Sequence, residues 1–158
     1  MSPERIKFRL VKGVKRTASR AIGFLGGDDR LDASAEFGKL KESRRRLILD
    51  SMDAWTNGTP DISTRFHGWP NDDECWMCYV FKAREGNVGH RFYGYLCNPL
   101  PDARGFRVCV ICTHARKTER ASDRAELLFV KSWSQSGEAL AAIRAGLFDK
   151  TEMETQTS

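Results

Sequence analysis

Residues 74–117 constrain the fold more than any other part of the sequence, because they concentrate aromatic and β-branched residues in short runs. Three apolar runs, at 75–82, 91–97 and 106–113, are separated by turn-forming residues at 85–89 and 98–105. Val, Ile, Phe, Tyr and Trp favour the pleated surface of a sheet, whereas Gly, Asn, Pro and Asp favour turns. The pattern predicts an antiparallel meander of three strands.

The segments that flank this meander have helical spacing. Apolar residues recur at three-, four- and seven-residue spacings within residues 35–55, namely Leu40, Leu47, Ile48, Met52 and Trp55. Gly38 is a candidate break between two pieces of this helix. Apolar residues also recur with helical spacing in residues 118–133 and 137–144. The expected fold class is α+β, with N-terminal helices packed on a small antiparallel β-meander and followed by one or two C-terminal helices.

The N-terminal region is strongly basic and has three interpretations. Ile6, Phe8 and Leu10 alternate with basic residues or valine, as in a short edge strand, whereas residues 14–25 also fit a short amphipathic helix. A poorly ordered basic arm is the third interpretation. We therefore expect a basic arm over residues 1–34, a single α+β domain over 35–150 and a flexible tail over 151–158.

The charge balance favours an anionic partner. The formal net charge is +5 on 158 residues, with a sequence pI near 9.1, and such a surface attracts nucleic acid. No apolar run is long enough to span a bilayer, and residues 22–25 are too short for the core of a signal peptide. We expect a cytoplasmic protein without a membrane partner.

Two CxxC pairs, Cys75/Cys78 and Cys109/Cys112, have the spacing of zinc ligands. Both lie in β-prone runs, where side chains at positions i and i+3 point to opposite faces, so the thiolates would diverge. Reduced cysteines in the core are the favoured interpretation. A zinc site is the alternative, and neither a metal ligand nor a cofactor is predicted.

Three short motifs accompany this order of elements. Residues 77–84 form an apolar strand that ends in Arg84, a second strand begins with His90 and Arg91, and residues 108–117 end in Lys117 and lead into a helix. Over residues 36–133 this pattern resembles the RelE/HigB superfamily of bacterial and phage-derived toxins. The resemblance implies a RelE-like domain.

The function that the resemblance implies is an endoribonuclease that cleaves mRNA without a metal, often on the ribosome, and that is countered by an antitoxin protein. Cleavage requires removal of the 2′-hydroxyl proton and stabilisation of a charged phosphorane, tasks for which clustered Arg and Lys are suited. The implied catalytic residues are Arg84, Arg91, Lys117 and His114. The implied RNA-binding residues are Lys82, His90, Arg116, Arg120 and Arg124.

The chain departs from the family in having no clear catalytic Tyr or His after its last helix. One alternative is a non-catalytic phage or plasmid protein that uses the same basic sheet to bind nucleic acid or a protein. A zinc-stabilised adaptor is a further alternative. The catalytic interpretation requires Arg84, Arg91 and Lys117 to lie on one face of the sheet.

Overall fold

A computed structural model describes residues 5–100, 102, 105–117 and 123–148. Its strands are β1 (Lys7–Leu10), β2 (Arg20–Gly26), β3 (Phe66–Gly68), β4 (Cys78–Glu85), β5 (Val88–Cys97) and β6 (Arg107–Lys117). Its helices are α1 (Ala33–Lys39), α2 (Glu42–Thr56), α3 (Arg124–Ser134) and α4 (Gly137–Leu147). None of these helices is long and apolar enough to cross a membrane.

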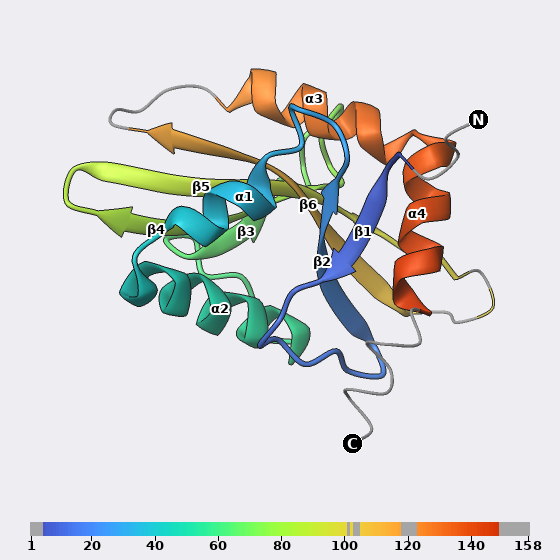
Figure 1. The fold of residues 1–158 in the computed structure, drawn as a ribbon, viewed down its shortest axis with the longest axis horizontal. Coiled ribbons are helices and arrows are strands. Elements are labelled where there is room, and N and C mark those ends of the chain that lie inside the picture. The colour runs from blue at the N-terminus through green and yellow to red at the C-terminus, as the bar shows by residue number, and fades with distance from the viewer. Residues whose placement is uncertain (1–4, 101, 103–104, 118–122, 149–158) are drawn as a thin grey trace.

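The strands form one sheet in the order β1-β2-β6-β5-β4-β3 (Figure 1). β4, β5 and β6 are successive antiparallel neighbours, as the meander predicts. Gly86 at the β4–β5 turn has a φ of 62°, a backbone conformation that glycine adopts without a steric cost. β2 pairs with β6 in parallel, and therefore the sheet is mixed.

The predicted layout, with helices first and a small antiparallel meander after them, is wrong. Two strands precede the helices, and the sheet has six strands of mixed direction. The proposed helix over residues 14–25 is instead occupied in large part by β2, while the edge strand proposed near Ile6 exists as β1. β2 was missed because it is buried on both faces and lacks the polar alternation of a half-exposed strand.

The helix predictions agree better with the structure. The predicted break near Gly38 separates α1 from α2, and the helix predicted over residues 137–144 is α4. The helix predicted over 118–133 is present as α3 from Arg124 onward, whereas residues 118–122 and the predicted tail lie outside the described residues.

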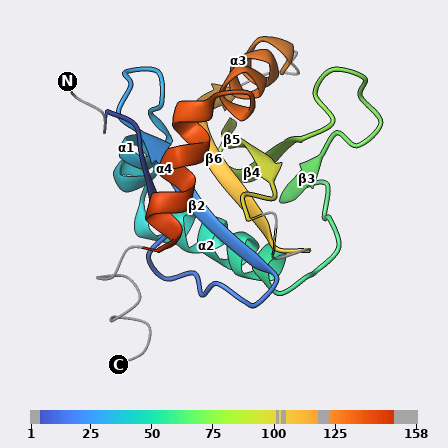
Figure 2. The ribbon, with the colours of Figure 1, turned by 90° about the vertical axis from the view of Figure 1, so that its right-hand side faces the viewer.

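The sheet lies between two helical layers (Figure 2). On one face α1 and α2 pack through residues such as Ile48, Met52 and Trp55. On the other face α3 and α4 pack through residues such as Leu127, Val130 and Ile143. Because both faces are covered, the central strands are almost continuously apolar.

A β-bulge in β6 determines which side chains face which helical layer. Tyr93 pairs with Thr113, but the next residue, Gly94, pairs with Ile111, so Cys112 is an extra residue in β6. An extra residue reverses the side-chain alternation beyond it. As a result, residues 113, 115 and 117 face α3, whereas 114 and 116 face α1 and α2.

Candidate nucleic-acid interface

Four cationic residues project from the α3 face at the end of the sheet formed by the β4–β5 turn. We call them the strand-end cluster: Lys82, Arg84, Arg91 and Lys117. Lys82 pairs with Arg91 across β4 and β5, while Arg84 and Lys117 are both in register with Gly89. Directly opposed side chains on neighbouring strands are in contact range. Three residues of the predicted catalytic set, Arg84, Arg91 and Lys117, therefore share one face.

Gly89 leaves a gap in the middle of this cluster. Among the described residues, a Cβ atom there would have only the Lys117 carbonyl oxygen within 4 Å, at 3.4 Å. The strands that carry Arg84 and Lys117 flank this position and are about 10 Å apart. A row of Arg84, Gly89 and Lys117 thus offers two cationic side chains around a backbone position that a ligand can approach closely.

Arg91 has a fixed position because Asp123 holds it. Its Nη1 lies 2.8 Å from Asp123 Oδ1, and the Tyr93 hydroxyl donates to the same carboxylate oxygen. Burial, and after it the hydrogen bond to Asp123, raise the pKa of Tyr93, so the phenol remains a donor. Asp123 stands at the start of α3 and links this helix to β5.

Lys82 lies beside Arg91 in the cluster. Its Nζ donates to the Ser63 carbonyl oxygen at 3.1 Å. Burial and the neighbouring Arg91 charge lower the pKa of Lys82. A lowered pKa increases the fraction of neutral amine near neutral pH, which is the form a general base requires.

The two predicted acid–base histidines lie on the opposite face of the sheet from Arg91. His90 Nδ1 and His114 Nε2 are 3.0 Å apart, and the His114 ring lies 4.8 Å from the Phe92 ring. Asp32 accepts a hydrogen bond from the His114 backbone N–H. The bulge at Cys112 places His114 on this face, and Lys117, three residues further along β6, projects from the other face.

The remaining predicted RNA-binding residues are dispersed. Arg116 is exposed and pairs in register with His90, on the α1 and α2 face. Arg124 Nη2 forms an ion pair with Asp72 Oδ2 at 2.7 Å. Arg120 lies outside the described residues. Lys82 belongs to the strand-end cluster and is the only one of this set that the described structure places there.

Lowering the pH is expected to destabilise the protein through the histidine pair. Burial lowers the pKa of both His90 and His114 below the ordinary value of 6.5, and the adjacent His90 lowers that of His114 further. The folded protein therefore binds fewer protons than the unfolded chain just below pH 6.5. The free energy of unfolding should be highest above pH 6.5 and should fall as the pH drops through the interval down to the lowered pKa values.

Urea unfolding at about pH 8 and about pH 5.5 measures this change. A His114→Phe variant, which keeps a ring beside Phe92, should show a smaller decrease. Equal free energies of unfolding for the unmodified protein at the two pH values would contradict the prediction.

The cysteine pairs differ in geometry. Cys109 packs against α2 residues, whereas Cys112 belongs to the core on the α3 and α4 face, as their spacing within a strand predicts. For Cys75 and Cys78 the predicted divergence is wrong, because residues 75–77 form a turn before β4 and both side chains belong to the core on the α3 and α4 face. Burial raises the pKa of Cys78 to about 12. Within the described part of the chain, no three His, Cys, Asp or Glu residues are grouped as metal ligands.

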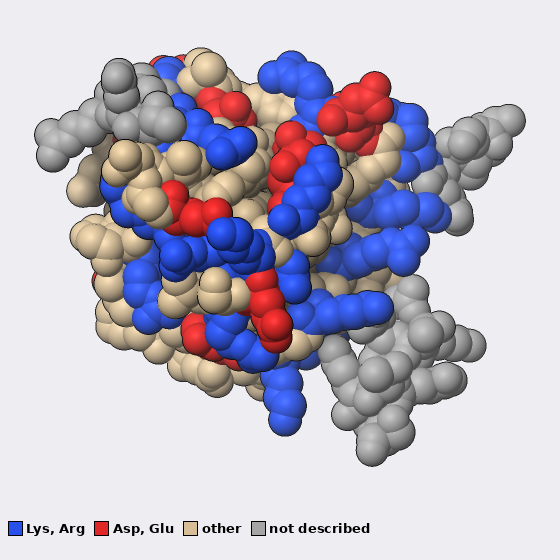
Figure 3. All heavy atoms as spheres, turned by 60° about the vertical axis from the view of Figure 1, so that its left-hand side comes forward, with Lys and Arg blue, Asp and Glu red and all other residues tan. Residues whose placement is uncertain are grey.

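Lys and Arg side chains cover much of the side of the molecule that carries the β4–β5 turn, with acidic side chains between them (Figure 3). Lys41 Nζ, just before α2, lies 3.6 Å from Glu85 Oε1 at this turn.

Comparison of the chain with protein-family models, curated proteins and solved structures finds no match. The function of the chain is therefore inferred from its geometry and its sequence motifs.

Sequence reasoning did not identify Gly89, Tyr93 or Asp123 as parts of this site. Gly89 could have been found from the hairpin register, because a two-residue turn at 86 and 87 places it opposite Arg84. The contact of Asp123 with Arg91 joins residues far apart in the chain, and no local pattern indicates it.

Proposed function

We propose that this protein is an endoribonuclease that binds messenger RNA at the strand-end cluster and cleaves it without a metal ion. The observation that carries the proposal is the row of Arg84, Gly89 and Lys117, where two cations flank a position that has no side chain. A phosphate in this row contacts a guanidinium on one side and an ammonium on the other. The resemblance to RelE/HigB-like toxins supports the same function, with the ribosome and an antitoxin protein as partners.

In the proposed reaction the ribose 2′-oxygen attacks the adjacent phosphorus, and the bond to the 5′-oxygen breaks. Lys82 accepts the 2′-hydroxyl proton as a neutral amine, and Lys117 donates a proton to the leaving 5′-oxygen. Arg84 and Arg91 stabilise the charge that develops on the phosphorane oxygens. His114 and His90 have no role in this step, because they lie on the other face of the sheet.

Induction in bacteria, together with cleavage of purified RNA, tests the proposal. The unmodified protein should arrest growth and cleave RNA in the presence of a chelator. Replacing Arg84 and Lys117 together by alanine should relieve the arrest and reduce the cleavage rate at least about a hundredfold. A Gly89→Val variant should also lose activity while remaining folded, because valine favours strands and its side chain fills the gap.

Arg116→Ala is the matched control, since it removes a cation from the same end of β6 but from the opposite face. Its cleavage rate should stay close to that of the unmodified protein. Equal loss in Arg116→Ala and in the double variant would contradict a specific site. Absence of both growth arrest and RNA cleavage for the unmodified protein would reject the ribonuclease function.

One observation favours a second candidate, a protein that binds RNA without cleaving it. Arg91 is already bound by Asp123 at 2.8 Å, and a carboxylate at this place competes with a phosphate for the guanidinium. RNA binding that weakens steeply with salt, unaccompanied by cleavage, would support this candidate over the enzyme.

A further inference from the structure

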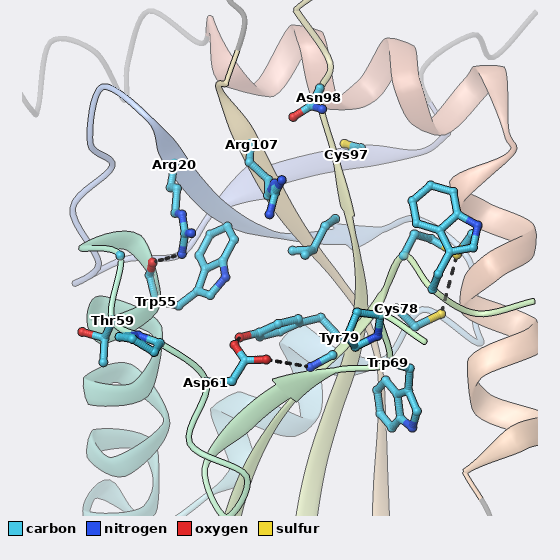
Figure 4. Close-up of a pocket in the computed structure, with 17 residues that line it drawn as sticks. Arg20, Trp55, Thr59, Asp61, Trp69, Cys78, Tyr79, Cys97, Asn98 and Arg107 are labelled. Atoms are coloured by element: carbon cyan, nitrogen blue, oxygen red, sulfur yellow. Dashed lines mark hydrogen bonds between the residues drawn. The ribbon is translucent and has the colours of Figure 1, made fainter. Parts of the chain in front are cut away.

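A pocket of about 360 Å³ lies at the opposite end of the sheet from the strand-end cluster. It opens where β2, β4 and β6 begin and β5 ends, next to the segment that follows α2 (Figure 4). Its size is in the range of small-molecule sites, which combine apolar walls with a few polar groups. The described residues that line this pocket include both apolar side chains and polar groups.

The apolar walls are mainly aromatic. Trp55, Trp69 and Trp76 line the pocket together with Tyr79, and the chain has four tryptophans in all. Trp76 is 61% exposed, which is unusual for so large an apolar side chain. Trp69 is half-buried, with its ring centroid 4.8 Å from that of His67. The Trp69 ring points away from Arg20, Arg107 and Asp61 (Figure 4), so a planar ligand between these groups would instead contact Trp55 and Tyr79 and gain burial free energy.

One wall carries two guanidinium groups. Arg20 Nη1 donates to the Trp55 carbonyl oxygen at 2.7 Å, and its guanidinium lies 4.8 Å from the Trp55 ring centroid. Arg107 is the register partner of Arg20 and extends into the pocket (Figure 4). No acidic side chain in the described part of the chain forms an ion pair with Arg107. Two adjacent cations without an acidic partner favour an anionic group.

The opposite wall carries a carboxylate. Asp61 Oδ1 accepts a hydrogen bond from the Tyr79 hydroxyl, and Asp61 Oδ2 accepts one from the Gly68 backbone N–H at 3.3 Å. Burial, and after it Asp61, raise the pKa of Tyr79, so this phenol stays protonated and holds the carboxylate in place. Each carboxylate oxygen can accept a second hydrogen bond, and amino groups on the edge of a nucleobase are suitable donors.

We infer that this pocket binds a nucleoside monophosphate unit whose base carries an exocyclic amino group. The base packs against Trp55 and Tyr79, its amino edge faces Asp61, and its phosphate binds Arg107 beside Arg20. A free nucleotide and one nucleotide of an RNA chain share this chemistry. The inference goes beyond the proposed ribonuclease function and does not depend on it, because the two sites are at opposite ends of the sheet.

Tryptophan fluorescence tests the inference directly, since three of the four tryptophans line the pocket. Titration with 5′-GMP should quench the fluorescence saturably, whereas UMP, which has no exocyclic amino group, and guanosine, which has no phosphate, should each bind more weakly. Arg107→Gln should weaken GMP binding about tenfold. Trp133→Phe, which removes the tryptophan outside the pocket, should leave both the quenching and the affinity unchanged.

Several results would overturn the inference: no saturable quenching by GMP, equal affinity for GMP in Arg107→Gln, or displacement of GMP by inorganic phosphate at equal concentration. Circular dichroism of each variant verifies that it is folded. A single-stranded RNA trinucleotide that binds more tightly than GMP, and less tightly to Arg107→Gln, would identify RNA as the source of the nucleotide. Binding of GMP without binding of the trinucleotide would identify a free nucleotide.

The outcomes for the two sites are separable. The Arg84→Ala, Lys117→Ala double variant should bind GMP as the unmodified protein does. If the unmodified protein fails to cleave RNA but binds GMP in the pattern described, the ribonuclease proposal fails and the nucleotide pocket stands. Loss of GMP binding in the double variant would overturn the assignment of the nucleotide to this pocket.

Discussion

Gly94→Ala is expected to lower the free energy of unfolding by about 3 kcal/mol. A Cβ atom at this position would lie 2.2 Å from the Val110 carbonyl oxygen and 2.9 Å from the Ile111 Cα. These are backbone atoms of the adjacent strand, and they cannot move away without disturbing the β5–β6 pairing. Urea denaturation followed by circular dichroism measures the loss.

Gly38→Ala in α1 is the matched control, because it adds the same methyl group where no described residue outside its own helix turn comes within 4 Å. It should raise the free energy of unfolding by about 0.5 to 1 kcal/mol, since alanine is the better helix former. A Gly94→Ala variant as stable as the unmodified protein would show that the bulge tolerates a side chain. It would also weaken the account of why Lys117, rather than His114, shares a face with Arg91.

Asp123→Ala is expected to destabilise the protein by about 2 kcal/mol. The substitution leaves the buried Tyr93 hydroxyl without its acceptor and removes the ion pair of Arg91, whose side chain is 24% exposed. It also detaches the start of α3 from β5. Thermal and urea unfolding measure the change in stability, while RNA titration of the same variant reports whether Arg91 becomes available to phosphate.

Tyr93→Phe separates the contribution of the Tyr93 hydrogen bond from that of the Arg91 ion pair, because it removes the hydroxyl and leaves Arg91 paired with Asp123. Its expected cost is about 1 kcal/mol. Combining both substitutions completes a double-mutant cycle, and a clear interaction energy is expected because the Tyr93 hydroxyl donates directly to the Asp123 carboxylate. Strict additivity of the two effects would contradict a shared hydrogen-bond network.

The sequence predicted the parts of the fold whose signals are local. Turn residues between apolar runs located β4, β5 and β6, and helical spacing around Gly38 located α1 and α2. β2 could not be identified in this way, because a strand covered on both faces is a short apolar run that periodicity cannot distinguish from a helix. Without β2, the mixed character of the sheet could not be predicted either.

The candidate site also has some features that a local sequence pattern predicts and others that it does not. Arg84 and Arg91 share a face because a tight turn fixes their register, and this relation is open to sequence reasoning. The face on which His114 lies could not be predicted from the sequence, because a single extra residue at Cys112 reverses the side-chain alternation in β6. A regular strand would have placed His114 beside Arg91 and turned Lys117 away. The pocket near Arg107 joins segments from across the chain, and no motif indicates it.

The parallel pairing of β2 with β6 has a consequence for synthesis of the chain. Arg20 is paired with Arg107, so β2 leaves the ribosome long before its central neighbour exists. Until β6 is made, the apolar residues Ala21 and Leu25 lack the neighbouring strand and the α3 and α4 residues of the core to which they belong. Such non-local pairing slows folding and exposes strand edges to aggregation. Folding of the nascent protein is therefore limited by the arrival of β6, the same strand that carries Lys117 to the proposed site.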